Sequence, residues 1–300
     1  EQIAYADEIK SLGGEIYIIP SRREDLFQHM NSLRKILKGH KEYDTIYFNI
    51  LSASEVFTVL SACFMRKVRK IVHSHNNSVK SVRRHCLLRP LLNFASDIKL
   101  ACSDEAAEFM FGTKSVQKNE VTVIFNAIDV DKYSFDCKIR DDVRNKLGIS
   151  AENYVIGHVG RLCYQKNSLF IIELFNHISH INENALLLMV GDGEDRNQVE
   201  QAIKQFGIEE KVLMLGMRND VDELMQAMDV FLLPSRFEGL PVVLVEAQTA
   251  GLQCICANRF TNKSDVTGNV EFIELEEDIE CWVTAVLSKQ GIERKSEKDA

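Results

Sequence analysis

Short apolar runs alternate with amphipathic stretches along most of the chain. Runs such as TIYFNI at 45–50, YVIGHV at 154–159 and ALLLMV at 185–190 are typical of buried parallel strands. Between such runs lie segments, 25–38 for example, whose apolar residues recur at helical spacing. Strands that alternate with helices predict parallel sheets with helices on both faces.

The alternation falls into two series, which the polar and charged stretch 131–152 separates. A length of 300 residues suits two domains of about 150 each. We therefore expect an α/β protein with two Rossmann-like domains, residues 1–130 and 131–300, that face each other across a cleft. Helices are expected at 4–12, 25–38, 54–65, 83–95, 103–110, 168–178, 196–206, 221–228 and 241–250, and strands at 15–19, 45–50, 70–73, 98–102, 121–125, 154–159, 185–190, 212–215, 229–234 and 253–257.

The second series is organised around the stretch 229–258, DVFLLPSRFEGLPVVLVEAQTAGLQCICAN. It predicts a strand, a polar turn, a helix with Pro241 at its first position and Gly251 after its end, and a second strand. In an open α/β sheet, ligands bind where the turn leaves the carboxyl end of the strand. Backbone N–H groups at the helix start would form an anion site there, namely those of Leu240, Val242 and Val243.

Two carboxylates, Glu238 in the turn and Glu246 in the helix, frame this anion site. Either one alone could be an ordinary solvated residue. Acids beside a phosphate are explained if the ligand also carries hydroxyls that need acceptors, as a nucleotide-sugar does on both sides of its diphosphate.

The string E-G-L-P-V-V-L-V-E resembles the paired-glutamate motif of retaining glycosyltransferases with the GT-B architecture, in particular those of family four. The resemblance implies that Glu238 contacts the donor sugar and takes part in catalysis, and that Glu246 holds the ribose. It also implies that the residues between them line the donor site: Gly239, Leu240, Pro241 and Val242.

A second motif follows the strand at 154–159, where Gly160-Arg161 leads to Lys166-Asn167. An approachable backbone, a fork of donors and a point charge suit a diphosphate, although charged loop residues are usually only solvated. The motif resembles the G-R-L…K-N element of the same family, which implies that Gly160, Arg161 and Lys166 bind the donor diphosphate. The resemblance also places three further residues in the donor cleft: Gly191, Gly193 and Met217.

In the first series, a strand ends in the sequence His73-Ser-His75-Asn76. Two histidines at this spacing could be a metal pair or, more simply, turn residues with satisfied hydrogen bonds. The family resemblance implies that His75, not His73, reaches the transferred sugar as a catalytic residue. It also assigns donor binding to Asn126, in the sequence N-A-I-D at the domain junction.

Together with the stretch E-x-I-E-x-W that ends at Trp282, these motifs look most like the branch that builds bacterial capsules and exopolysaccharides. That branch implies a nucleotide-sugar donor, with UDP-sugars favoured, and a glycan acceptor that is typically lipid-linked. The family usually begins with a strand and a Gly-rich loop and ends with a long helix. Neither is recognisable here and the chain starts without Met, so we expect a fragment.

Composition narrows the remaining possibilities. The net charge of −8 argues against nucleic-acid binding. The 8 cysteines are scattered, which fits a reduced cytoplasmic compartment and argues against a zinc site. No apolar run approaches the roughly 20 residues of a membrane span. Basic residues nevertheless gather between Arg66 and Arg89, and could dock the protein on an anionic membrane.

The family resemblance makes a retaining sugar transferase the leading hypothesis. No D-x-D motif stands at the end of a cleft strand, so we expect the enzyme to need neither a metal nor another cofactor. Two alternatives remain open. A nucleotide-sugar epimerase of the same architecture would process the donor without an acceptor. A non-catalytic GT-B partner in a polysaccharide assembly complex would bind the donor without turnover.

Overall fold

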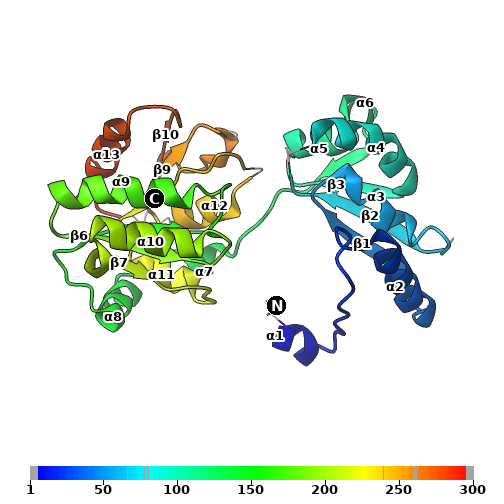
Figure 1. The fold of residues 1–300 in the computed structure, drawn as a ribbon, viewed down its shortest axis with the longest axis horizontal. Helices are drawn as coiled ribbons and strands as arrows, with labels where there is room; N and C mark the ends of the chain where they lie inside the picture. Colours follow the sequence, from blue (N-terminus) through cyan, green and yellow to red (C-terminus); the bar gives the residue numbers. More distant parts are fainter. Residues whose placement is uncertain are drawn as a thin grey trace. The chain divides into compact units, whose positions relative to one another are not determined.

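A computed structural model describes residues 6–294 except 66, 77, 78, 80, 239, 260 and 261. The chain forms two compact α/β units that divide between Ile124 and Phe125 (Figure 1). The boundary expected from the sequence, between 130 and 131, lies a few residues later.

Unit 1 is built on a parallel sheet in the order β1-β2-β3-β4. Fully buried residues such as Val59, Val72, Leu92 and Met110 fill its core. Its strands are β1 (Thr45–Ile50), β2 (Arg69–Ser74), β3 (Ile98–Ala101) and β4 (Val121–Val123), and its helices are α1 (Ala6–Ser11), α2 (Leu26–Gly39), the 3₁₀ turn Ala53–Glu55, α3 (Val56–Leu60), α4 (Val82–Ala95), α5 (Asp104–Phe111) and α6 (Thr113–Gln117).

Side-chain caps explain where two of these helices begin. The carboxylate of Asp25 accepts a hydrogen bond from the N–H of Gln28 at 2.9 Å, and the hydroxyl of Ser103 accepts one from Ala106 at 3.1 Å. Each cap satisfies a backbone donor that the first turn leaves without a helical partner. The sequence prediction of Ser103 as a cap is confirmed.

The strand expected at 15–19 is wrong. This segment pairs with no strand among the described residues. Ile18 is 82% exposed, so the segment has no apolar layer to pack on, and β propensity alone does not hold a strand. The helix expected at 54–65 is also shorter, since α3 ends at Leu60 and the chain continues in turns.

Unit 2 is built on a parallel sheet in the order β10-β9-β8-β5-β6-β7. Two apolar clusters pack on its faces, one around Phe175 and Trp282 and the other around Phe231 and Leu244. Its strands are β5 (Tyr154–Val159), β6 (Ala185–Val190), β7 (Val212–Met214), β8 (Val230–Leu233), β9 (Gln253–Ala257) and β10 (Val270–Ile273), and its helices are α7 (Val130–Tyr133), α8 (Cys137–Leu147), α9 (Ser168–Ile181), α10 (Arg196–Phe206), α11 (Val221–Ala227), α12 (Val242–Thr249) and α13 (Ile279–Leu287), with 3₁₀ turns Glu209–Lys211 and Asn262–Ser264.

The stretch 131–152, expected to lie in the second domain without helices or strands of its own, belongs to unit 2 and is largely helical. Asp129 and Asp136 cap α7 and α8, and Gly148 closes α8 in a left-handed conformation with φ 69°. The strand β10 was also not predicted. Among the described residues, no helix is long and apolar enough to cross a membrane.

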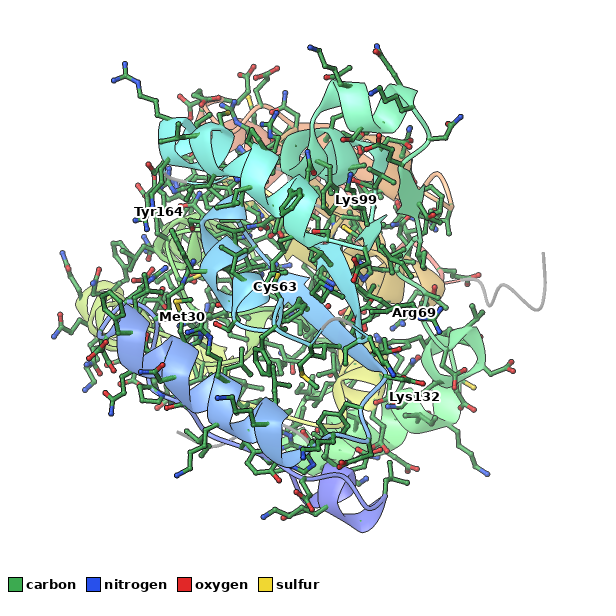
Figure 2. The ribbon with its side chains drawn as sticks, turned by 90° about the vertical axis from the view of Figure 1, so that its right-hand side faces the viewer. Met30, Cys63, Arg69, Lys99, Lys132 and Tyr164 are labelled. Carbon is green, nitrogen blue, oxygen red and sulfur yellow. The ribbon has the colours of Figure 1, made fainter. Side chains whose placement is uncertain are left out.

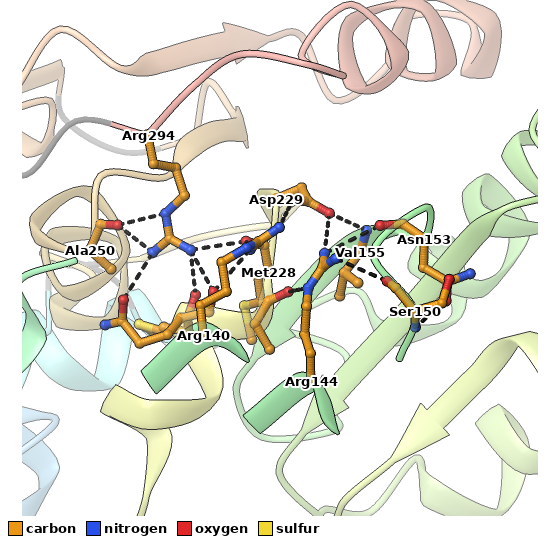
Figure 3. Close-up of polar contacts among 12 residues, drawn as sticks. Arg140, Arg144, Ser150, Asn153, Val155, Met228, Asp229, Ala250 and Arg294 are labelled. Atoms are coloured by element: carbon orange, nitrogen blue, oxygen red, sulfur yellow. Dashed lines mark hydrogen bonds and ion pairs between the residues drawn. The ribbon is translucent and has the colours of Figure 1, made fainter. Parts of the chain in front are cut away.

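A cluster of arginines ties α8 to the amino end of the sheet (Figure 3). Asp229, just before β8, accepts from Arg140 at 2.6 Å, from Arg144 at 2.7 Å and from the N–H of Val155 at 2.7 Å. Arg294 donates to carbonyl oxygens at the ends of α11 and α12, including that of Ala250 at 2.9 Å. Burial lowers the pKa of Arg294 to about 9.

Candidate functional site

The loops that leave the carboxyl ends of β5, β6 and β7 are joined by backbone hydrogen bonds. The N–H of Gly160 donates to Val190 at 2.9 Å, and that of Leu162 donates to Asp192 at 3.1 Å. The N–H of Gly191 donates in turn to Gly216 at 2.8 Å. The three loops therefore form one continuous rim on this end of the sheet.

Two glycines allow the rim to close. Gly191 has φ +132°, and a Cβ there would lie 1.9 Å from the carbonyl oxygen of Gly160. A Cβ on Gly193 would lie 2.2 Å from the carbonyl oxygen of Leu162. Any larger residue would push the loops apart, which is the close-approach role of glycine. Donor contact by Gly191 and Gly193 stays a prediction, since the structure shows them packed on the neighbouring loop.

The ion pair of Lys166 with Glu238 joins the loop after β5 to the turn after β8. The Nζ of Lys166 lies 2.8 Å from Oε1 of Glu238. Gln165 donates to Oε2 of Glu238 at 3.3 Å and to the carbonyl of Phe237 at 3.1 Å. Two predicted site residues from distant parts of the sequence thus touch directly.

Arg161 is much more exposed than Lys166. Its side chain is 71% exposed, and its Nε lies 3.0 Å from a carboxylate oxygen of Glu194. Met217, predicted to lie beside the base, is also exposed. Nearby in the chain, the guanidinium of Arg236 stacks on the exposed ring of Tyr164, with 4.5 Å between its carbon and the ring centre.

The helix after the turn begins one residue later than predicted. Pro241 is the N-cap, with an extended ψ of 101°, and Val242 is the first residue of α12. Leu240 immediately precedes the cap, and Gly239 lies outside the described residues. Glu246 accepts a hydrogen bond from the hydroxyl of Tyr133 at 2.9 Å, and burial raises the pKa of its carboxyl.

His158 on β5, which was not predicted from the sequence as a candidate, lies beside Gly160 and Lys166. It is fully buried, and its Nδ1 lies 2.9 Å from the carbonyl oxygen of Leu232, so Nδ1 carries the hydrogen and Nε2 is an acceptor. Burial lowers the pKa of His158 to about 4, which keeps the ring neutral. Within the described structure Nε2 has no hydrogen-bond partner, and neither has the buried hydroxyl of Ser235 after β8. The strand pattern marked His158 only as one more core position.

Lys166 and His158 meet at Gly160. A Cβ on Gly160 would lie 3.3 Å from Nε2 of His158 and 3.3 Å from side-chain carbons of Lys166. The absence of a side chain therefore leaves the lysine stem room beside a neutral imidazole. This explains why glycine suits position 160 independently of any contact with a ligand.

In unit 1, the two histidines of the HSH sequence differ in their surroundings. His73, on β2, is buried and hydrogen-bonded to the hydroxyl of Tyr47. His75, just after β2, is part-exposed, and its Nε2 lies 2.9 Å from Oδ1 of Asn49. Burial lowers the pKa of both rings. Among the described residues, no group of three or more His, Cys, Asp or Glu could hold a metal ion.

The predicted site residues are thus divided between the units. His75 lies at the end of β2 in unit 1, whereas the predicted diphosphate-binding residues and the glutamates lie in unit 2. Asn126 lies in the segment between β4 and α7 and is part-buried.

Comparisons with known proteins identify the chain. Residues 139–288 match the family model for glycosyl transferases group 1. Over 291 residues, 94% of this chain and 76% of the relative, the chain is 32% identical to the putative glycosyltransferase EpsF of Bacillus subtilis. The chain belongs to the glycosyl transferase group 1 family.

A further relative and a solved structure extend the match. The UDP-Gal:alpha-D-GlcNAc-diphosphoundecaprenol alpha-1,3-galactosyltransferase of Escherichia coli is 30% identical over 85% of this chain and 68% of its own length. The crystal structure of Anabaena Alr3699/HepE in complex with UDP and glucose matches with a TM-score of 0.78 at 22% identity, over 95% of this chain and 79% of that one.

These matches confirm the predicted GT-B fold and the leading hypothesis that this group 1 member is a glycosyltransferase. None of the relatives reported above is named as an epimerase or as a non-catalytic partner.

Proposed function

We propose that the chain moves a sugar from a UDP-sugar to a lipid-linked glycan, with retention of anomeric configuration, during synthesis of a bacterial surface polysaccharide. The observation that carries the proposal is the contact between Lys166 and Glu238. A cation for the diphosphate beside a carboxylate for hydroxyls matches the chemistry of a nucleotide-sugar. The names of relatives support this, since they refer to UDP-Gal and a diphosphoundecaprenol acceptor, to capsular polysaccharide and to amylovoran.

Retention requires either a protein nucleophile or attack on the face that the diphosphate leaves. Glu238 is already held by Lys166 and Gln165, and it is better suited to accept hydrogen bonds from sugar hydroxyls. We therefore assign no carboxylate nucleophile. In the proposed step, the bond from the anomeric carbon to the diphosphate breaks as the acceptor oxygen bonds on the same face, and the acceptor proton passes to the leaving diphosphate.

The charge on the leaving diphosphate must be neutralised, and we propose that Lys166, Arg161 and the N–H groups at the start of α12 do this without a metal or cofactor. The chain has two D-x-D sequences, Asp129-Val-Asp131 and Asp220-Val-Asp222, and carboxylates from both make contacts within unit 2. Asp129 caps α7 by accepting from the N–H of Lys132 at 3.2 Å. Asp222 lies 3.3 Å from Nζ of Lys132, and Asp220 pairs with Arg218.

The reaction is tested by its product and its metal requirement. A thermal-shift screen of UDP-, GDP- and dTDP-sugars identifies the donor, because a ligand at about 100 times its dissociation constant stabilises the fold by roughly 2.7 kcal/mol. With that donor, we expect an α-linked product from an α-linked donor, and activity that persists in EDTA. A β-linked product, or activity lost on chelation and restored by Mg²⁺ or Mn²⁺, would overturn the mechanism.

We assign His75 to the transferred sugar, where it would position hydroxyls and stabilise developing charge. His73 supplies a matched control, because it is the same residue type two positions away but buried against Tyr47. We expect His75→Ala to reduce turnover sharply and His73→Ala to reduce it less. The reverse order would remove His75 from the mechanism.

A lipid-linked acceptor requires the enzyme to work at the inner face of the membrane. Lys67, Arg69, Arg83 and Arg84 are exposed on unit 1, and Figure 2 marks Arg69 on β2. Lys70 is held instead in an ion pair with Asp97 at 2.6 Å, while Arg66 and Lys80 lie outside the described residues. Each basic residue near an anionic surface contributes about 1 kcal/mol.

The helix α4 adds an apolar component to this surface. Leu87 is 79% exposed, Phe94 is 85% exposed, and Leu91 between them completes one stripe at helical spacing. Arg83 lies one turn before Leu87, so basic and apolar side chains share a face, as in helices that lie in a membrane interface. We therefore propose reversible docking of unit 1 on anionic lipid through α4 and its basic neighbours.

Co-sedimentation with vesicles tests the docking. Binding should rise with the fraction of phosphatidylglycerol in phosphatidylcholine vesicles and fall with salt. The double variant Leu87→Ser, Phe94→Ser should bind less than the control Ile181→Ser, which removes an exposed apolar residue from α9 in unit 2. Binding that does not change with the fraction of anionic lipid or with salt would rule out α4 and its basic neighbours as the docking surface.

A further inference from the structure

The carboxylate of Glu238 is held on both oxygens by two consecutive residues of another loop. Nζ of Lys166 forms an ion pair with Oε1 at 2.8 Å, where Oε1 accepts no hydrogen bond from the described residues, and Gln165 donates a hydrogen bond to Oε2 at 3.3 Å. Glu238 is only 7% exposed, so little of this carboxylate is left to water. A lysine and a glutamine therefore form a two-point clamp on the residue assigned to the donor sugar.

The two arms of the clamp differ in how a phosphate would affect them. Lys166 is a mobile point charge on a flexible stem, with room beside Gly160, and a diphosphate competes with Glu238 for it. Gln165 is neutral, so a diphosphate does not attract it in the same way. Its backbone carbonyl also accepts from the N–H of Arg236 at 2.8 Å, and its side chain bonds the carbonyl of Phe237, which anchor it on the turn after β8.

We propose that Lys166 and Glu238 form an ion pair in the ligand-free enzyme, and that the bound donor replaces this pair with its own contacts to both side chains. The diphosphate takes Lys166, Glu238 is released to accept hydrogen bonds from the sugar, and Gln165 is the positioning residue that keeps the carboxylate in place during the exchange. This inference rests on the proposed function, in which Lys166 binds the diphosphate and Glu238 the sugar.

The exchange makes recognition of the sugar depend on the diphosphate. A nucleotide without a sugar breaks the pair but offers Glu238 no hydroxyl in return. A nucleotide-sugar breaks the same pair and then satisfies the carboxylate again. Glu238 should therefore weaken the binding of UDP itself, the opposite of what an ordinary binding residue does.

Calorimetric titration of UDP into the full chain tests the Lys166 arm. We expect Glu238→Gln to tighten UDP binding by about three- to tenfold, the range of a partly buried ion pair. Removal of a negative charge also relieves repulsion, so the same substitution is made in the Lys166→Ala background, where the gain should largely disappear. Unchanged or weaker UDP binding by Glu238→Gln, or an equal gain in both backgrounds, overturns the exchange.

The Gln165 arm has its own readout. With the UDP-sugar selected by the thermal-shift screen, Gln165→Ala should weaken binding by about tenfold or more, the range of one hydrogen bond to a charged group. The affinity for UDP alone should stay within about twofold, since Gln165 does not touch the diphosphate in this scheme. Gln205→Ala on α10, where the glutamine is exposed, is the matched control. Equal losses for UDP and the UDP-sugar would give Gln165 a merely structural role.

Failure of the inference and failure of the proposed function give different results. If Lys166→Ala leaves UDP affinity unchanged, the diphosphate does not bind where we place it, and the proposed function fails with the inference. If Lys166→Ala weakens UDP while Glu238→Gln does not tighten it, the donor site stands and only the exchange is wrong.

Discussion

The two ends of the unit 2 sheet hold buried charges in opposite ways. At the amino end, Asp229 and its arginines bond to one another and to backbone carbonyls in a closed network (Figure 3). At the carboxyl end, Lys166 and Glu238 share one ion pair, and buried polar atoms of His158 and Ser235 have no partner within the described structure. Satisfied networks support a fold, whereas open polar groups suit a ligand. The difference indicates that the amino end stabilises the fold and that the carboxyl end is suited to bind a ligand.

The largest effect is expected from a substitution that disrupts the closed network at the amino end of the sheet. Asp229→Ala leaves buried guanidinium groups without their carboxylate, and removing one partner of such a network costs about 3–5 kcal/mol of unfolding free energy. Denaturant titration measures this loss. Glu271→Ala is the control, because Glu271 is exposed and, among the described residues, forms an ion pair with Lys289 alone, at 2.7 Å. Its cost should stay below about 1 kcal/mol. Equal costs for the two variants would contradict the structural role of the amino end.

The next effect concerns pH at the open end. The pKa of His158 falls from an ordinary 6.5 to about 4 in the fold. Between these values the unfolded chain binds a proton that the native state does not. The free energy of unfolding is therefore highest above pH 6.5, and His158 lowers it progressively as the pH falls toward 4. The shift corresponds to about 3 kcal/mol.

His158→Asn keeps a donor for the carbonyl of Leu232 but cannot titrate in this range. Unfolding measured at a series of pH values should show a shallower acid decline in the variant than in the wild type. If the unfolding free energies of the wild type and the variant depend on pH in the same way, protonation of His158 does not destabilise the native state. Water would then reach the ring at the carboxyl end of the sheet, in contradiction to its burial.

A smaller effect tests the open end as a binding site. A charge-assisted hydrogen bond to phosphate contributes roughly 1.5–3 kcal/mol, so Lys166→Ala should reduce kcat/KM by about tenfold to a hundredfold or more. Its unfolding free energy should change less than that of Asp229→Ala, because Glu238 keeps the hydrogen bond from Gln165, whereas the loss of Asp229 removes the partner of two arginines and of a backbone N–H at once. If stability falls as much as activity, the contrast between the two ends disappears.

The smallest effect sharpens the site. Tyr133→Phe removes the hydroxyl that donates to Glu246 at 2.9 Å and nothing else from the ring. A single hydrogen bond contributes about 0.5–1.5 kcal/mol, so donor affinity should fall by less than about tenfold while turnover at saturating donor is unchanged. A loss of turnover instead would place Glu246 near the reacting atoms rather than at the ribose.

The regular elements of unit 2 followed from sequence because local pattern and tertiary environment agree there. The strands at 154–159, 185–190 and 253–257 are buried on both faces, and their apolar runs match the strand bounds in the structure. The segment 15–19 shows the limit of this reasoning, since its composition favours a strand but no neighbour pairs with it. The helix α8 was missed because its polar sequence hides arginines that reach buried partners.

Motifs select candidate site residues, but they do not predict the contacts between them. Spacing and resemblance selected Lys166 and Glu238, but only the fold brings them within 2.8 Å of each other. The same limit applies to His158, which reads as a core residue until the strands place its ring beside Lys166. A contact between segments far apart in the chain leaves no local pattern to detect.

Arg294, the last described residue, also affects the electrostatics of α12, the helix that follows the turn after β8. The peptide dipoles of α12 add to roughly half a positive charge at its start and half a negative charge at its end. Arg294 lies 2.9 Å from the carbonyl oxygen of Ala250, at the negative end. That pole is therefore compensated within the protein, and the positive pole of the same helix is left for an incoming anion.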